Sequence, residues 1–276
     1  MFKIIKKSVL SDDVCRFEIM APEIANTRKP GQFVIIRLHE HGERVPFTIA
    51  DSGSNSGTVT IIVQAVGKTT KELNAFFKVG DSIKDVVGPL GKATHIENFG
   101  TAVVVGGGLG IAVMYPIAAA LKEAGNKLVT ILGSRTYDLL ILEKELSVIS
   151  DELIVCTDDG SSGFHGFVTQ PLDKMLKDSI NVDFVIAAGP IPMMKNVANV
   201  TKPYSVRTFV SLNPIMVDGT GMCGACRVNV GGETKFACVD GPEFDAHLVD
   251  FDLLQARNSA YIENEKESLE RFSRNS

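Results

Sequence analysis

The sequence lacks a long run of apolar residues, and this absence excludes several classes of protein. No stretch approaches the roughly 20 consecutive apolar residues that a membrane-spanning helix needs. The first residues, MFKIIKKSVLSDD, mix apolar and charged side chains and so lack the apolar centre of a signal peptide. We therefore expect a cytoplasmic protein with no membrane partner.

The chain also lacks an excess of positive charge. Its 28 Lys and Arg residues are outnumbered by 33 Asp and Glu residues, which gives a net charge of -5, and the basic residues are scattered. Binding to nucleic acid requires a basic surface that neutralises phosphates. Nucleic acid is therefore not an expected partner.

Cysteine is scarce and odd in number. The chain has 5 cysteines, and three of them, Cys223, Cys226 and Cys238, fall within sixteen residues. This distribution is typical of metal ligands in a reducing compartment and not of a disulfide framework. Cys15 and Cys156 lie in apolar, strand-like runs, and we expect both to be unreactive core residues.

Two different patterns of predicted secondary structure follow one another along the chain. Up to residue 97, β-branched runs such as VCRFEIM and TVTIIVQAV are separated by turn residues, which predicts a small antiparallel barrel. From residue 101, strand patterns alternate with helix patterns, as in TAVVVGGG and LGIAVMYPIAAALKEAG, which predicts a parallel, doubly wound α/β sheet. The predicted segments are an FAD-binding β-barrel over 1–97, an NAD(P)-binding α/β domain over 98–210, a cluster-binding segment over 211–245 and a helical or frayed tail over 246–276.

The stretch VDGTGMCGACRV, residues 217 to 228, carries the most specific motif. Asp218 stands five residues before Cys223. Cys226 follows three residues after Cys223, and Cys238 comes twelve residues after Cys226. This spacing is that of a plant-type [2Fe-2S] site, C-x4-C-x2-C…C, with Asp in the first place. The predicted metal ligands are therefore Asp218, Cys223, Cys226 and Cys238. Zinc is the competitor, although structural zinc usually shows two C-x2-C pairs.

A glycine run joins a predicted strand to a predicted helix in VVVGGGLGIA, residues 103 to 112. Glycines at such a turn let a dinucleotide pyrophosphate approach the backbone, and the helix N-terminus favours its charge. The spacing is not the strict G-x-G-x-x-G, and no acidic residue ends the second strand. Nucleotide binding and an ordinary strand-helix turn therefore stay equally open from these residues alone.

Six short motifs, in order along nearly the whole chain, resemble the ferredoxin reductase superfamily. They are RVPFT (44–48), GKTTKEL (67–73), GPLG (88–91), GGGLG (106–110), AAGPIPMM (187–194) and the Asp/Cys segment. Within the superfamily, the chain is similar to the electron-transfer subunits of dihydroorotate dehydrogenase B. It resembles more closely the small subunits of NADH-dependent ferredoxin:NADP oxidoreductases, electron-bifurcating transhydrogenases that share aspartate at position 218, where the dihydroorotate dehydrogenase subunits carry cysteine.

The resemblance implies FAD, NAD(H) and a [2Fe-2S] cluster as cofactors and assigns residues to each. The first flavin motif comprises Arg44, at the FAD phosphate, with Pro46, Phe47 and the catalytic candidate Thr48 near the reactive edge of the flavin. The second flavin motif comprises Gly67, Thr69 and Thr70. Helix capping would explain Thr69 or Thr70 equally well.

For the nucleotide, the implied contacts are Gly107, Gly108 and Gly110 at the pyrophosphate, and Gly189 and Pro190 beside the nicotinamide. Ser134 and Arg135 follow the second strand, where relatives that prefer NADP hold the 2'-phosphate. A solvated loop arginine is at least as consistent with Arg135. Asp158 is either a ribose contact or part of a turn.

The implied activity is the conversion of two-electron transfer from NAD(H) into one-electron transfer through FAD and the cluster. Electrons then need an exit, and the resemblance implies a larger partner subunit with FAD and [4Fe-4S] clusters, similar to the glutamate synthase small subunit. Ferredoxin and NADP(H) would react with that partner. Two alternatives stay open: an electron-transfer subunit of dihydroorotate dehydrogenase B, and a non-catalytic binding module stapled by zinc.

Overall fold

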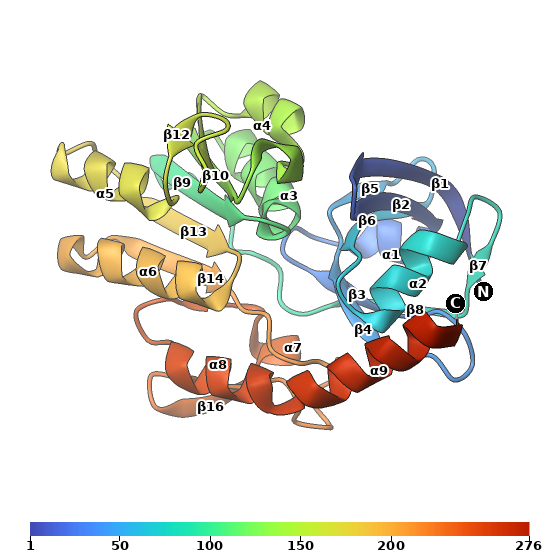
Figure 1. Ribbon diagram of the computed structural model, residues 1–276. Helices are drawn as coiled ribbons and strands as arrows, with labels where there is room; N and C mark the ends of the chain where they lie inside the picture. The colour runs from blue at the N-terminus through green and yellow to red at the C-terminus, as the bar shows by residue number, and fades with distance from the viewer. Residues whose placement is uncertain (276) are drawn as a thin grey trace.

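The computed structural model describes residues 1–275, which form a barrel, an α/β domain and a C-terminal segment (Figure 1). Two antiparallel sheets, in the orders β5-β6-β2-β1-β7 and β4-β3-β8, make the predicted barrel. Its elements are β1 (Phe2–Ser11), β2 (Val14–Met20), α1 (Pro22–Thr27), β3 (Phe33–Arg37), β4 (Val45–Thr48), β5 (Asp51–Gly53), β6 (Thr58–Gln64), α2 (Lys68–Phe76), β7 (Ser82–Ile83) and β8 (Asp85–Leu90).

The pleat of β6 explains why its sequence is apolar along its whole length. Side chains on one face, such as Ile61 and Val63, pack in the barrel core. Ile62 points the other way and packs with residues of the α/β domain, including Ile111. Because successive strand residues point to opposite faces, both faces of β6 are buried. The barrel therefore shares an apolar contact with the α/β domain.

The α/β domain is built on a seven-stranded sheet in the order β12-β11-β10-β9-β13-β14-β17, in which β17 (Glu243–Asp245) comes from the C-terminal segment. All strands except β17 pair in parallel, as the alternating pattern predicts. Helices α3 and α4 cover one face, and α5 and α6 cover the other (Figure 1). The elements are β9 (Thr101–Gly107), α3 (Gly110–Glu123), β10 (Lys127–Ser134), η1 (Tyr137–Leu139), α4 (Glu143–Ile149), β11 (Glu152–Thr157), β12 (Phe164–His165), α5 (Thr169–Lys177), β13 (Phe184–Ala188), α6 (Ile191–Thr201), η2 (Lys202–Tyr204) and β14 (Arg207–Ser211).

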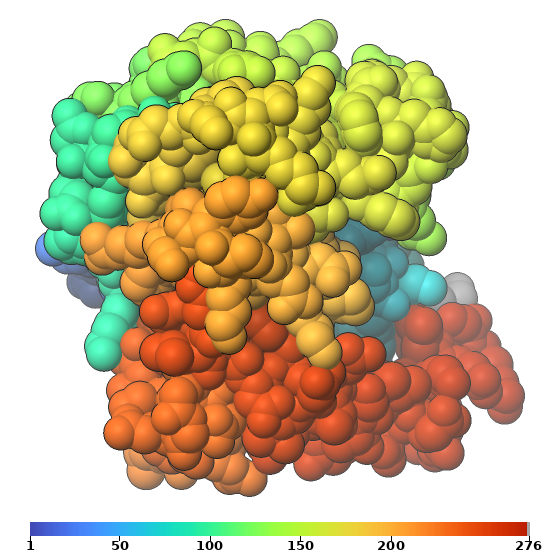
Figure 2. All heavy atoms as spheres, turned by 90° about the vertical axis from the view of Figure 1, so that its left-hand side faces the viewer, coloured from blue at the N-terminus to red at the C-terminus, as the bar shows by residue number. Residues whose placement is uncertain are grey.

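The C-terminal segment returns to the other two parts of the chain. It comprises β15 (Arg227–Val230), β16 (Glu233–Phe236), α7 (Ala237–Asp240), β17 (Glu243–Asp245), α8 (Phe251–Asn258), η3 (Ser259–Tyr261) and α9 (Ile262–Asn275). Strand β17 adds to the α/β sheet beside β14, and Phe272 of α9 meets Phe76 of α2 edge-on at 6.1 Å. Figure 2, seen from the side of α5 and α6, shows this segment (red) below the α/β domain and the barrel behind. The predicted tail, from residue 246, is largely helical in the described residues. The predicted domain boundaries stay predictions.

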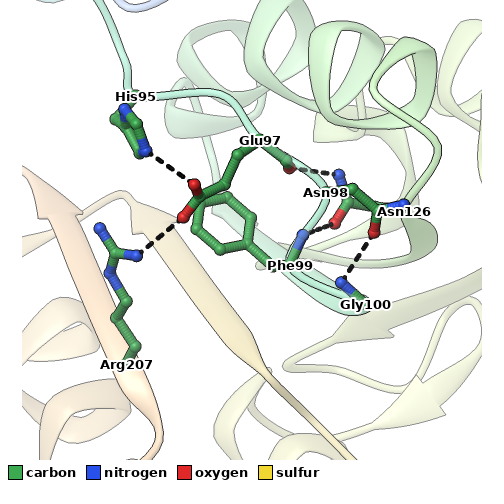
Figure 3. Close-up of polar contacts among 7 residues, drawn as sticks. All are labelled: His95, Glu97, Asn98, Phe99, Gly100, Asn126 and Arg207. Carbon is green, nitrogen blue, oxygen red and sulfur yellow. Dashed lines mark hydrogen bonds and ion pairs between the residues drawn. The ribbon is translucent and has the colours of Figure 1, made fainter.

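The linker between the barrel and the α/β domain, residues 91–100, makes polar contacts with the α/β domain (Figure 3). The Glu97 carboxylate pairs with the Arg207 guanidinium, at 3.1 Å between Oε1 and Nη1, and with His95, at 3.2 Å between Oε2 and Nε2. The Asn126 side chain donates to the Glu97 carbonyl and accepts from the Phe99 amide. The Arg207 guanidinium also lies 5.1 Å from the centre of the Phe99 ring. These contacts fix the end of the linker on the α/β domain.

Among the described residues, no helix combines the length and the apolar character needed to cross a membrane.

Candidate functional site

A cavity of about 1060 Å³ lies between the barrel, the carboxyl edge of the parallel sheet and the C-terminal segment. This volume is at the upper end of the range for sites that enclose a cofactor or small molecule. Most residues predicted to bind flavin or nucleotide line it: Pro46, Phe47, Thr48, Thr70, Gly107, Gly108, Gly110, Ser134, Arg135, Asp158, Gly189 and Pro190. The fold thus brings both predicted sets to one space.

The three predicted nucleotide-binding glycines of the β9–α3 turn, Gly107, Gly108 and Gly110, lie in different surroundings, so the lack of a side chain serves a different purpose at each. A Cβ on Gly110 would lie 2.1 Å from the Ala188 carbonyl oxygen, so this glycine allows α3 to approach β13. A Cβ on Gly107 would lie 2.3 Å from Met193 Sδ, so this glycine makes room for a side chain. Gly108 has a φ of +55° and nothing within 4 Å of its Cβ position. Gly108 is therefore the glycine whose Cβ position is open, just before a fourteen-residue helix whose N-terminus favours an anion.

Met193 is a lining residue that sequence reasoning left out. Its side chain lies over both predicted nucleotide loops, since a Cβ on Gly189 would also meet it, at 2.7 Å from Cε. Met194, its neighbour in α6, is fully buried in the core. The helical pattern of α6 predicts burial for part of IPMM but cannot tell which methionine faces the cavity.

On the barrel side, β4 carries the first flavin motif into the wall of the cavity. The antiparallel register places Thr48 opposite Phe33 and Phe47 opposite Val34. Phe47 is buried in the barrel core as well as lining the cavity. Arg44 precedes β4, is exposed, and does not line the cavity.

The second flavin motif forms the beginning of α2. Thr70 Oγ1 accepts from the Gly67 amide at 2.9 Å and donates to the Gly67 carbonyl at 3.0 Å, which is a helix-capping contact. The Thr69 hydroxyl donates to the carboxylate of Glu43, and neither Gly67 nor Thr69 lines the cavity. The capping alternative thus describes the contacts of Thr70, and the roles of these residues in flavin binding stay predictions.

At the far end of the cavity, backbone contacts tie the loops after β10 and β11 together. The Asp158 amide donates to the Ser134 carbonyl at 3.1 Å. The Ser134 hydroxyl donates to the Thr136 carbonyl at 2.6 Å and is therefore already engaged. The Arg135 side chain is exposed at the rim. Of the predicted pair, Arg135 is thus the residue with a free polar group to offer a nucleotide.

The cluster-binding segment brings together two of its four predicted ligands. Cys226 and Cys238 are buried with their Sγ atoms 3.2 Å apart, whereas Cys223 is exposed. The Asp218 carboxylate accepts from the amides of Thr220, at 2.8 Å, and Cys223, at 3.0 Å. Within residues 1–275, no group of three or more His, Cys, Asp or Glu side chains is gathered closely enough to hold a metal ion.

The donor chemistry and the loop conformation nevertheless fit an iron-sulfur cluster. Gly219, Gly221 and Gly224 all have positive φ values, of +79°, +84° and +64°, which turn the loop tightly. The Thr220 amide holds the pKa of Asp218 below its usual range, so this carboxylate is ionised. Burial and the Cys226 thiol raise the pKa of Cys238 to about 12, so metal binding would release its proton.

The remaining two cysteines behave as predicted for core residues. Cys15 and Cys156 are 7% and 1% exposed, and neither lies in the cluster-binding segment. Burial raises the pKa of Cys156 to about 11, which leaves its thiol protonated and unreactive.

Glu243 is a partly buried carboxyl group that sequence reasoning missed. It begins β17 and accepts a 2.6 Å hydrogen bond from the hydroxyl of Thr94 in the linker. A Cβ on Gly31 would lie 2.7 Å from Glu243 Oε1, so the carboxyl fills a notch in the barrel. Desolvation raises the pKa of Glu243 to about 7 despite the Thr94 hydrogen bond. A single Glu among polar residues carries no sequence signal for such burial.

Stability should therefore depend on pH through Glu243. The folded protein holds this proton more tightly than the unfolded chain, whose carboxyl has the ordinary value of 4.5. The stabilising contribution is thus complete below about pH 4.5 and is lost as the pH rises through about 7. Between pH 5 and pH 8 we expect wild type to lose about 2.5 kcal/mol more unfolding free energy than Glu243→Gln. Urea unfolding at both pH values measures this; equal losses would contradict it.

Comparisons with known proteins give the cavity and the cysteine segment a context. Residues 213–250 match the family described as the iron-sulfur cluster binding domain of dihydroorotate dehydrogenase B. A Thermotoga maritima protein named as a dihydroorotate dehydrogenase B (NAD(+)) electron transfer subunit homolog is 53% identical over 270 residues, covering 98% of this chain and 95% of that protein. The Fusobacterium nucleatum dihydroorotate dehydrogenase B (NAD(+)) electron transfer subunit is 33% identical, covering 88% and 95%.

Two solved structures extend the comparison to the fold. A chain from the NADH-dependent reduced ferredoxin-NADP oxidoreductase, solved in a study of flavin-based electron bifurcation, superposes with a TM-score of 0.93 at 52% identity. The match covers 99% of this chain and 98% of that one. A ferredoxin reductase of carbazole 1,9a-dioxygenase shares the fold at 22% identity, with a TM-score of 0.65 over 74% of this chain and 64% of the other.

Proposed function

Because the chain belongs to the family of dihydroorotate dehydrogenase B electron-transfer subunits and their homologues, we propose that it passes electrons between NAD(H), FAD and a [2Fe-2S] cluster. The observation that carries this proposal is the single cavity lined by both the flavin motif of β4 and the nucleotide motif of β9–α3. A flavin takes up two electrons with a hydride and releases them singly, and the cluster carries single electrons.

The residues of the chain serve this chemistry by position. The N-terminus of α3 favours the nucleotide pyrophosphate and the open Cβ position of Gly108 leaves room for it, while Thr48 lies on the opposite, barrel wall. The cluster loop lies against the same barrel sheet, since a Cβ on Gly219 would lie 2.7 Å from Ile35 and from Leu90. Ile35 pairs with Pro46 of the flavin motif. Strand β3 is thus the one strand between the flavin motif on β4 and the cluster loop at Gly219.

Within the family, we assign the chain to a ferredoxin:NADP oxidoreductase of the electron-bifurcating kind. The 52% identity to a chain of that enzyme supports this assignment, as does Asp218. The F. nucleatum dihydroorotate dehydrogenase subunit is only 33% identical, whereas the 53% identical T. maritima protein is named as a homolog of such a subunit. The proposed partner is a larger subunit with FAD and [4Fe-4S] clusters that reacts with ferredoxin and NADP(H), in the cytoplasm. Orotate formation by a reconstituted complex would favour the dihydroorotate dehydrogenase alternative instead.

The cofactor content of the isolated chain tests the proposal. We expect a yellow-brown protein with about one FAD, two irons and two acid-labile sulfides per chain. Zinc in place of iron and sulfide, in a colourless protein, would favour a zinc-stapled binding module and overturn the assignment.

The nucleotide preference of the bound flavin forms a separate prediction. We expect NADH to reduce it faster than NADPH, because the chain resembles an NADH-dependent enzyme and Arg135 is a single exposed cation at the predicted 2'-phosphate position, in a cavity that Asp158 also lines. Arg135→Ala should then change both rates by less than about threefold, which corresponds to well under 1 kcal/mol. Stopped-flow reduction decides this. A preference for NADPH that Arg135→Ala abolishes would make Arg135 a 2'-phosphate ligand.

A further inference from the structure

Two guanidinium groups lie against the turn inside the C-x2-C motif, at Gly224 and Ala225. A Cβ on Gly224 would lie 2.8 Å from Arg227 Nη1, so the missing side chain makes room for this guanidinium. The Ala225 carbonyl accepts a hydrogen bond from Arg257 Nη2 at 3.3 Å. Both cations therefore contact the short turn that joins two of the predicted cluster ligands.

Arg257 reaches this turn from a helix that is packed in place. It lies in the last turn of α8, whose Phe251 and Leu254 are buried in the same apolar core as two of the predicted ligands. The next residue, Asn258, donates from its side chain to the Asn213 carbonyl at 3.0 Å. The fold thus brings the guanidinium to a carbonyl that lies 32 residues earlier in the sequence.

The two arginines at the turn differ from the other cations of the C-terminal segment in their lack of a carboxylate partner. Residues 211–275 contain six Lys and Arg residues. Neither Arg227 nor Arg257 forms an ion pair with a carboxylate of the described chain. The other four pair with glutamates: Lys235 with Glu233, Lys266 with Glu263, Arg271 with Glu267 and Arg274 with Glu270. The unpaired positive charge of the segment is thus concentrated at one turn.

Positive charge beside an iron-sulfur site favours the reduced state. The predicted ligands, three thiolates and one carboxylate, bring four negative charges, and reduction adds one more. A nearby cation stabilises the added charge and so raises the midpoint potential. From this placement we infer that Arg227 and Arg257 raise the midpoint potential of the cluster, an inference that rests on the proposed function. Each arginine thereby makes the cluster easier to reduce from the flavin.

A redox titration of the cofactor-loaded chain, followed by paramagnetic resonance, tests the inference. Arg227→Gln and Arg257→Gln each remove a charge and keep a long side chain. At the wild-type midpoint potential, each should lower the ratio of reduced to oxidised cluster about threefold, and the double variant about tenfold, which is about 59 mV for one electron. Lysine at either position keeps the charge and should stay within about twofold of wild type. Arg271→Gln is the matched control, because the Arg271 side chain is 79% exposed in α9 and pairs with Glu267, and it should leave the potential unchanged.

The possible failures are distinguishable. Wild-type potentials in both glutamine variants, with the iron content intact, would overturn the inference and leave the proposed function standing. If a glutamine variant loses its iron, the lysine variant at the same position decides: an iron-loaded protein with the wild-type potential supports the role of charge, and any other result overturns it. Absence of iron and sulfide from the wild-type chain would overturn the cluster part of the proposed function together with this inference.

Discussion

Replacing Asp218 by alanine is expected to make the iron-sulfur cluster labile, so that the purified variant retains less than about a tenth of the wild-type iron. The reason is the loss of one of four ligands in a loop whose other members, Cys223, Cys226 and Cys238, are too few to complete both iron sites. Asp218→Cys should keep the cluster. Carboxylate and thiolate carry the same charge, but a soft sulfur replaces a hard oxygen, so the midpoint potential and the paramagnetic resonance spectrum should shift.

The Asp218 carboxylate accepts two hydrogen bonds from loop amides, and these contacts supply the competing explanation. If that is its whole role, both variants will show the wild-type resonance spectrum and potential, and the fourth ligand must be another group. Asp252→Ala is a suitable control because Asp252 lies in the same C-terminal segment, is 81% exposed and pairs with Lys195. The control should leave iron content and spectrum unchanged.

Replacing Gly110 by alanine should cost about 3 kcal/mol of unfolding free energy or more, since the added Cβ meets a carbonyl oxygen of the backbone at 2.1 Å. The Ala188 carbonyl belongs to the end of β13, in the centre of the sheet, and cannot move without disturbing its neighbours. Gly108→Ala is the matched comparison, two residues away. There the cost should be only about 1 kcal/mol, from the positive φ, because the Cβ position is open.

The two glycine variants should also separate stability from binding. Gly108→Ala should keep most of its stability but weaken NAD+, because its added methyl group projects into the space where the pyrophosphate approaches. Denaturant unfolding and calorimetry with NAD+ measure the two effects. A Gly108→Ala variant as unstable as Gly110→Ala would contradict the different roles assigned to these glycines.

Local patterns were sufficient to predict most of the architecture. The alternation in VCRFEIM and the glycine run after TAVVV each depend on residues close in sequence, and β2 and the β9–α3 turn follow them. Strand β17 was not predictable, because three residues gain their strand conformation only by pairing with β14, more than thirty residues earlier. The return of α9 to α2 likewise depends on a distant contact, between Phe272 and Phe76.

The candidate site likewise contains residues that local motifs predict and contacts that they do not. Motif order selected Thr48, Gly108 and Gly189, which line one cavity, while their roles in binding stay predictions. It could not predict that Gly107 is a glycine because Met193 lies against it, or that Glu243 is desolvated by the linker and the barrel. The first depends on how α6 packs beside the β9–α3 turn, and the second on how β17 meets the linker and the barrel. Both are contacts between residues far apart in the sequence, and no short stretch of sequence encodes them.

The central claim, that one chain couples a two-electron donor to a one-electron carrier, is tested most directly by an anaerobic titration of the isolated protein with NADH. Visible absorption and paramagnetic resonance should be followed on the same samples. We expect the flavin absorption to bleach and the resonance of a reduced [2Fe-2S] cluster to grow as NADH is added. A protein that contains flavin and iron but shows neither change, or whose flavin bleaches while the cluster stays oxidised even with excess NADH, would contradict the account.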